Sequence, residues 1–163
     1  MRYLFFFVLI SALVFTACDS EDMAEKIAEK AMESGSGEDV DIDIDDENVS
    51  IKSKDGEVAY SAGKSAKMPD NFPEDVFMHD NAEIIYSASA NEGFSIKYNI
   101  NEKDEDAIAT LKNEMEDKGW EVKSEMNMQG YLAKVFEKEK RTATVTVAQS
   151  EDKSMVSIVV GNK

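Results

Sequence analysis

Apolar and polar positions alternate in short runs along the second half of the chain, which is typical of half-buried strands. This pattern predicts six strands, over 83–90, 94–100, 120–126, 131–137, 142–149 and 155–160. Between the second and the third, Ile108, Leu111 and Met115 recur at helical spacing, after a capping residue, Asn101, and before a stop at Gly119. The order is ββαββββ, and its short links favour antiparallel pairing. We therefore predict an α+β fold in which one amphipathic helix covers an antiparallel sheet of about six strands.

The aromatic residues of this region fall on positions that we assign to the core: Phe94, Tyr98, Trp120, Tyr131 and Phe136. Met126 is expected to face inward on the same strand as Trp120. The same aromatic set could instead line a ligand groove. Phe72, Phe77 and Met78 lie in a turn-rich segment, where they could form an exposed patch for a partner or plug the edge of the sheet.

Shorter alternating runs precede this domain. Val40, Ile42 and Ile44 alternate with aspartates, and two further runs, 49–53 and 57–62, are joined by a hairpin signal at Lys54-Asp55-Gly56. We interpret residues 38–68 as a three-stranded β meander. The pattern leaves open whether this meander joins the main sheet.

A short helix is predicted upstream of the meander. Ser20 is a suitable N-cap, and Ser34-Gly35-Ser36-Gly37 ends the helix with a flexible link. A narrow apolar stripe at helical spacing consists of Met23, Ala24, Ile27, Ala28, Ala31 and Met32. Such a helix could bind a partner or self-associate. Alternatively, it could be a stalk that frays or packs loosely on the domain.

The N-terminus has the pattern of an export signal. Arg2 precedes an apolar run, Tyr3 to Phe15, which is shorter than the ~20 residues of a membrane span but suits the central region of a signal peptide. The run ends in Phe15-Thr16-Ala17-Cys18, and the chain then becomes acidic. Such a segment could be an ordinary signal peptide with an incidental cysteine or an uncleaved membrane anchor.

This ending resembles the lipobox of bacterial lipoproteins, in which Leu, a small residue and Gly or Ala precede the cysteine. Phe15 departs from that pattern, and the resemblance covers about 20 residues. It implies removal of residues 1–17 and acylation of Cys18 by fatty acids such as palmitate, which would anchor the protein in the membrane of the cell envelope. Asp19 resembles the residue that retains enteric lipoproteins at the inner membrane, so the domain would face the periplasm or the exterior.

Charge and cysteine content exclude several classes of function. The chain has 34 acidic and 18 basic residues and a net charge of −16. Such acidity argues against nucleic-acid binding and against electrostatic docking of the folded domain on anionic lipid. One cysteine and one histidine exclude a disulfide framework and a Cys/His zinc site within one chain.

Candidate chemistry is sparse. Asp41, Asp43 and Asp45 have the spacing that begins a calcium loop, but Asp46 replaces the required glycine and Lys52 the glutamate at the twelfth position. We interpret these aspartates as the solvated side of a strand. The single histidine, His79, is expected at the surface or half-buried in a loop, without the partners of a catalytic triad. We therefore assign no catalytic, metal-binding or cofactor-binding residue, and the only site residue is Cys18.

These observations predict a non-enzymatic, lipid-anchored envelope protein of binding or assembly type. Its expected parts are a signal peptide (1–17), a lipidated N-terminus with helix and linker (18–37), the acidic meander (38–68) and the α+β domain (69–163). The bound species would be an envelope protein, a peptide or a small apolar ligand. The alternatives are a small periplasmic hydrolase with a carboxylate pair or His79 at a pocket mouth, and a regulatory subunit or inhibitor of an envelope enzyme.

Overall fold

The computed structural model describes residues 40–45, 48–53, 58–128, 130–150 and 153–163. Its elements are β1 (Val40–Asp45), β2 (Asn48–Ser53), β3 (Val58–Gly63), β4 (Glu83–Ala90), β5 (Gly93–Ile100), α3 (Asp104–Asp117), β6 (Glu121–Met128), β7 (Tyr131–Lys138), β8 (Arg141–Ser150) and β9 (Lys153–Asn162). The predicted signal peptide (1–17), Cys18 and the short helix predicted within residues 18–37 lie outside the described residues. Within the part of the chain that is described, no helix is long and apolar enough to cross a bilayer.

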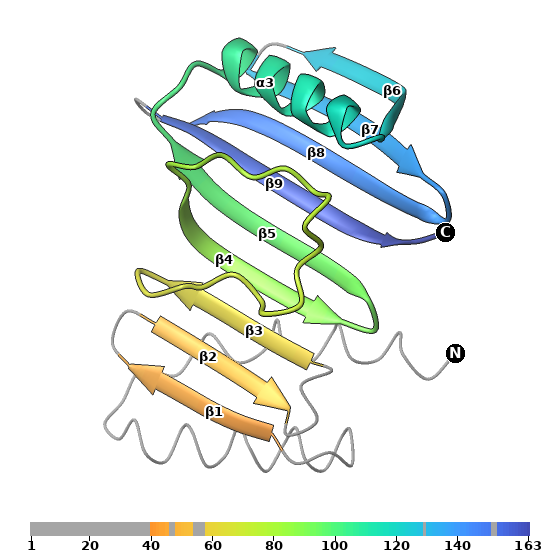
Figure 1. Cartoon of the computed structure of the whole chain (residues 1–163). Coiled ribbons are helices and arrows are strands. Elements are labelled where there is room, and N and C mark those ends of the chain that lie inside the picture. Colours follow the sequence, from red (N-terminus) through yellow and green to blue (C-terminus); the bar gives the residue numbers. More distant parts are fainter. Residues whose placement is uncertain (1–39, 46–47, 54–57, 129, 151–152) are drawn as a thin grey trace.

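All nine strands form one antiparallel sheet, in the order β1-β2-β3-β4-β5-β9-β8-β7-β6 (Figure 1). After β5 the chain forms α3, returns at the far edge of the sheet as β6, and folds back strand by strand until β9 pairs with β5. The prediction of a sheet of about six strands, preceded by a β meander whose pairing with that sheet the pattern leaves open, is therefore wrong. Strand β3 pairs with β4, from Val58↔Ala90 to Ala62↔Tyr86, so β1, β2 and β3 continue the sheet.

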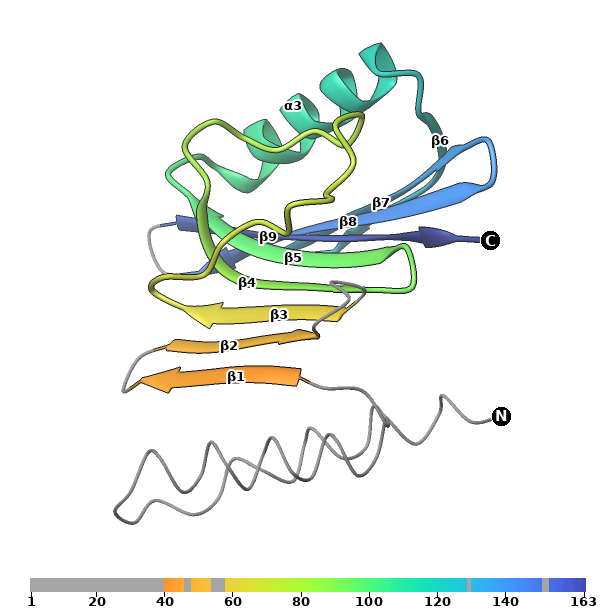
Figure 2. The same ribbon diagram turned by 60° about the horizontal axis from the view of Figure 1, so that its bottom comes forward.

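The sequence misses the β3–β4 pairing because no tight turn joins these strands. They are connected by the segment 64–82, which contains turns but no helix or strand. This segment crosses the sheet on the same side as α3 (Figure 2). The ring of Phe72 packs edge-on against Phe94, with centroids 5.6 Å apart. Phe72, Phe77 and Met78 are partly buried against the core, so they do not form an exposed patch for a partner.

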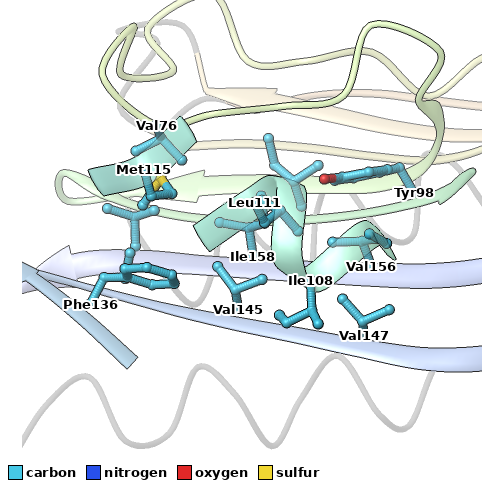
Figure 3. Close-up of a cluster of buried hydrophobic side chains, with 14 of the residues drawn as sticks. Val76, Tyr98, Ile108, Leu111, Met115, Phe136, Val145, Val147, Val156 and Ile158 are labelled. Carbon is cyan, nitrogen blue, oxygen red and sulfur yellow. The ribbon is translucent and has the colours of Figure 1, made fainter. Parts of the chain in front are cut away.

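The hydrophobic core lies between the sheet and α3 (Figure 3). The helix packs across β6, β7 and β8, and its buried residues are Ala107, Ile108, Leu111 and Met115. The sheet contributes, among others, Ile96, Tyr98, Phe136, Val145, Val147, Val156 and Ile158. Burial of each large apolar side chain contributes about 1.5–3 kcal/mol relative to exposure, so this layer is the main source of stability.

The helix begins later than expected. Its N-cap is Lys103, which makes no side-chain capping hydrogen bond, and not Asn101. Three acidic residues in the first turn, 104–106, interact favourably with the helix dipole instead. At the other end, Gly119 has a φ of +86°, which confirms the predicted glycine stop.

Strand β6 contains an irregularity that changes the direction of its later side chains. The register shifts between Val122 and Ser124, as in a β-bulge. Beyond it Met126 is 53% exposed, so the prediction that Met126 faces inward is wrong. Tyr131 is 37% exposed, also against prediction, because it lies five positions from the buried Phe136 and therefore on the opposite side of β7.

Candidate functional site

A groove opens between the first turns of α3 and the end of the β6–β7 hairpin. It has a volume of about 290 Å³ and is lined by Glu105, Ile108, Glu125, Met126, Asn127, Leu132, Ala133 and Lys134. Three elements that are adjacent in space therefore build it, with α3 on one side and the edge strand β6 and its neighbour β7 on the other. We call this feature the α3–β7 groove.

The floor of the α3–β7 groove is apolar and its rim is charged. Ile108 and Leu132 are 8% and 9% exposed, so their side chains belong to the core and leave only a small surface to the groove. On the rim, Lys134 Nζ lies 2.9 Å from Glu125 Oε1, and this hydrogen bond holds the pKa of Glu125 below its usual range. An apolar floor with a few polar groups at the edge is the usual composition of a small-molecule site.

The bulge in β6 places two of the groove residues. Because the register shifts after Val122, Glu125 pairs with Lys134 and Asn127 with Leu132, on the side of the sheet that faces α3. Unbroken alternation would have directed the opposite set of side chains toward the helix. Sequence reasoning missed the groove for this reason, although the polar run Lys123-Ser124-Glu125 within an expected inward-facing strand was a signal of irregularity.

His79 lies apart from the groove, within the segment 64–82, and its ring is buried against Tyr98 of β5. It is 6% exposed, so the expectation of a surface or half-buried histidine is wrong, because its loop packs against β5. His79 Nδ1 and the Tyr98 hydroxyl share a hydrogen bond of 3.0 Å, and the ring also packs against Phe77. Nε2 has no hydrogen-bond partner within the described part of the chain and lies 3.9 Å from Glu102 Oε2.

Burial determines the titration of this pair. Desolvation lowers the pKa of His79, and the nearby carboxylate of Glu102 opposes that shift only in part. Desolvation also raises the pKa of Tyr98 far above its usual value. The two rings are therefore neutral near pH 7, and the pair serves as a buried polar contact of the core.

The aspartates of β1 lie on its exposed side, as expected for a solvated face. Asp41 and Asp43 are exposed, whereas Ile42 between them is 1% exposed. Asp45 Oδ1 accepts a hydrogen bond of 2.8 Å from Asn48 Nδ2. No group of three or more potential metal ligands occurs among the described residues.

A second polar cluster joins the segment 64–82 to the sheet. The carboxylate of Asp75 accepts two hydrogen bonds from the Arg141 guanidinium and one of 2.7 Å from Lys138 Nζ. Its backbone carbonyl accepts a hydrogen bond of 2.7 Å from Trp120 Nε1. The sequence gives no signal of this cluster, because the partners of Asp75 lie 45 to 66 positions away from it along the chain.

Asp75 should make the protein sensitive to acid. Hydrogen bonds from Arg141, and secondarily from Lys138, lower its pKa from 3.8 to about 2. Because the folded state favours the ionised carboxylate, Asp75 contributes fully to the free energy of unfolding above about pH 4. This contribution is lost as the pH falls toward about 2. The free energy of unfolding of the unsubstituted protein should therefore fall between about pH 4 and pH 2. We expect this fall to be smaller by about 1–2 kcal/mol in Asp75→Asn, as measured by urea denaturation at several pH values in this range.

Asp70→Asn is the matched control, since Asp70 is 95% exposed and makes only a 3.5 Å contact with Lys52. It should keep the acid sensitivity of the unsubstituted protein. Equal acid sensitivity in Asp75→Asn and in the unsubstituted protein would show that the Asp75 cluster does not control this range.

One family model, described as START domain-like, matches residues 87–153. The matched stretch extends from β4 to the first residue of β9 and includes α3. It contains every residue that lines the α3–β7 groove. No curated protein is similar enough to the chain to match it.

Proposed function

We propose that this chain is an exported, lipid-anchored protein of the cell envelope whose sheet-and-helix domain binds a small apolar ligand in the α3–β7 groove. The observation that carries the binding role is the groove itself, with an apolar floor and a charged rim. The similarity to a START domain-like model supports this role, because the matched residues include the whole groove.

The size and lining of the groove define the class of ligand. A volume of about 290 Å³ lies just below the range of about 300–1,000 Å³ for drug-sized ligands, so the groove suits a small ligand. Ile108 and Leu132 would contact an apolar body, while the Lys134–Glu125 pair at the rim offers both a cation and an anion to a polar end. A single acyl chain or a small ring system with one polar group fits this description.

The geometry favours binding over hydrolysis. Two carboxylates, Glu105 and Glu125, line the groove, but a general acid requires a raised pKa and that of Glu125 is lowered by Lys134. His79 is buried elsewhere in the core and does not line the groove. We therefore propose a non-enzymatic role.

The proposed location depends on the N-terminal sequence. The apolar run before Cys18 supports export, and the resemblance of Thr16-Ala17-Cys18 to a lipobox supports acylation of Cys18. Asp19 favours retention at the inner membrane. In this arrangement the lipid holds the protein at the membrane while the groove remains accessible to ligands.

Filling the groove should abolish ligand binding. Asn127 is exposed and lines the groove, so Asn127→Trp should place a large side chain in it without disturbing the core. The test is a fluorescent fatty acid titrated into residues 18–163 carrying Cys18→Ser. We expect Asn127→Trp to weaken binding at least about tenfold, or 1.4 kcal/mol.

Ser124→Trp is the control, because Ser124 is exposed on the same strand but pairs with Val135 on the side away from α3. This variant should bind the probe as the unsubstituted chain does. Equal affinity in both tryptophan variants, or no binding by the unsubstituted chain, would contradict the proposed role of the groove.

A further inference from the structure

The apolar side chains of the sheet face α3 in its central strands but face the opposite side in β1, β2 and β3. In β5, Phe94 and Ile96 face α3 and the segment 64–82, whereas Ser95 between them faces away. Following the register from Ser95 through Ala88 and Tyr60 leads to Ile51 and then to Ile42. The apolar residues of β1 to β3 therefore face away from the helix.

We call this second apolar surface the rear face. It is formed by Ile42, Ile44, Val49, Ile51, Tyr60 and Tyr86. Tyr60 and Tyr86 pack edge to face, with ring centroids 5.4 Å apart. On the helix side of the same strands lie Lys52, which contacts Asp70, and Asn48, which accepts a hydrogen bond from the backbone of Ser65.

One residue of the rear face, Ile42, is more buried than its position explains. Ile42 is 1% exposed although β1 is the outermost strand of the sheet. Helix α3 and the segment 64–82 lie on the other side of the sheet, and among the described residues no helix or connecting segment lies over the rear face (Figure 2). An isoleucine on an edge strand is buried only when something packs on it, so this face requires an occupant.

We propose that the occupant is the segment Met23–Met32 of the same chain, which docks on the rear face as an amphipathic helix. Its apolar stripe supplies the complementary surface, while its charged residues lie on the opposite side, toward solvent. Ten helical residues extend about 15 Å, which is close to the length of roughly 20 Å of the six-residue strands β1 to β3.

The connection to β1 permits this docking. Seven residues, 33–39, separate Met32 from Val40, and four of them are Ser34-Gly35-Ser36-Gly37. Such a link can span up to about 25 Å and is flexible enough to turn back under the first strand. A short tether also gives the segment an effective concentration of about millimolar, which favours it over a second copy of the chain.

Docking of this segment would place the domain directly at the membrane. Only four residues separate Cys18 from Met23, so a docked helix leaves no room for a long spacer between lipid and sheet. This consequence rests on the proposed lipid anchor, whereas the docking itself does not. The segment would then be part of the fold, and not a free stalk.

Photo-cross-linking tests the docking directly. A benzophenone amino acid replaces Ile27 in residues 18–163 carrying Cys18→Ser, and chains labelled with ¹⁴N and ¹⁵N are mixed in equal amounts. We expect mass spectrometry to find cross-links from position 27 to β1, β2 or β3 within a single isotopic chain. The same probe at Glu29, on the charged side of the helix, should give at least about tenfold fewer such products.

Cross-links that join the two isotopes would overturn the proposal in favour of a second copy as the occupant. Cross-links to α3, or none to β1–β3, would overturn it as well.

A second measurement uses hydrogen exchange of the β1 and β2 amides. Ile27→Glu should accelerate this exchange at least about tenfold, because it places a charge in the docked surface. Lys30→Gln, which makes the same change in charge outside the apolar stripe, should leave the exchange unchanged. Equal protection in both variants would also contradict the docking. Neither measurement involves the α3–β7 groove, so its result is independent of ligand binding.

Discussion

Replacing Trp120 with alanine should lower the free energy of unfolding by about 3–5 kcal/mol, the largest loss that we expect from any single core substitution. The side chain is 2% exposed and lies just after the glycine that ends α3, where helix, sheet and the segment 64–82 meet. Its indole N–H donates to the Asp75 carbonyl at 2.7 Å, and the Arg141 guanidinium lies 5.1 Å from the ring centroid. Truncation would create a cavity and leave a carbonyl without its donor.

Urea denaturation followed by circular dichroism measures this loss without relying on tryptophan fluorescence. Tyr131→Ala is the matched control, since it also truncates an aromatic residue, but one that is 37% exposed on the side of the sheet away from α3. The control should cost less than about 1.5 kcal/mol. Similar losses in the two variants would show that Trp120 does not anchor the junction.

The contrast between these two aromatic residues shows what alternation can predict. The glycine stop and the inward direction of Trp120 follow from local spacing, so both could be predicted from the sequence. The prediction that alternation places Tyr131 in the core together with Phe136 is wrong, because the two residues are five positions apart and an odd spacing puts them on opposite sides of one strand. The error is therefore one of parity within a strand that was otherwise predicted correctly.

The groove could not be predicted, because it depends on a single irregularity in β6. A shift of one position between Val122 and Ser124 exchanges the two sides of the strand, so Met126 becomes exposed and Asn127 faces the helix side. Local composition does not fix such a shift, which is set by pairing with β7. The same limit applies to the Asp75 cluster, whose partners meet only after the sheet has formed.

The extent of the sheet was missed for a different physical reason. Alternation shows that Ile42 and Ile44 share a face, but it does not show on which side of the sheet that face lies. In β1 to β3 the apolar side is opposite to that of β5, so a pattern that resembles an independent meander is in fact a continuation with its sides exchanged. Only the long-range pairing of β3 with β4 distinguishes these two arrangements.

Substituting Cys18 with serine should abolish fatty-acid incorporation and release the protein from the membrane. Serine keeps the size and polarity of the position but lacks the thiol that receives the diacylglyceryl group in the lipoproteins that this N-terminus resembles. Each buried CH₂ of an acyl chain contributes about 0.8 kcal/mol, so two or three chains anchor a protein stably whereas none or one does not. Because Cys18 is the only cysteine of the chain, no other thiol can substitute for it.

The measurement is labelling of cells with a clickable fatty acid, followed by fractionation into membrane and soluble material. Ser20→Ala is the control, since it changes a hydroxyl two positions away and leaves Thr16-Ala17-Cys18 intact. It should be labelled as strongly as the unsubstituted protein, and Phe15→Leu, which completes the usual lipobox, should be labelled at least as strongly. If Cys18→Ser were labelled as strongly as these variants, Cys18 would not be the attachment site.

The same fractionation tests export. If the unsubstituted protein were found dissolved in the cytoplasm with Met1 retained, export would be contradicted, since a functional signal is removed at the membrane.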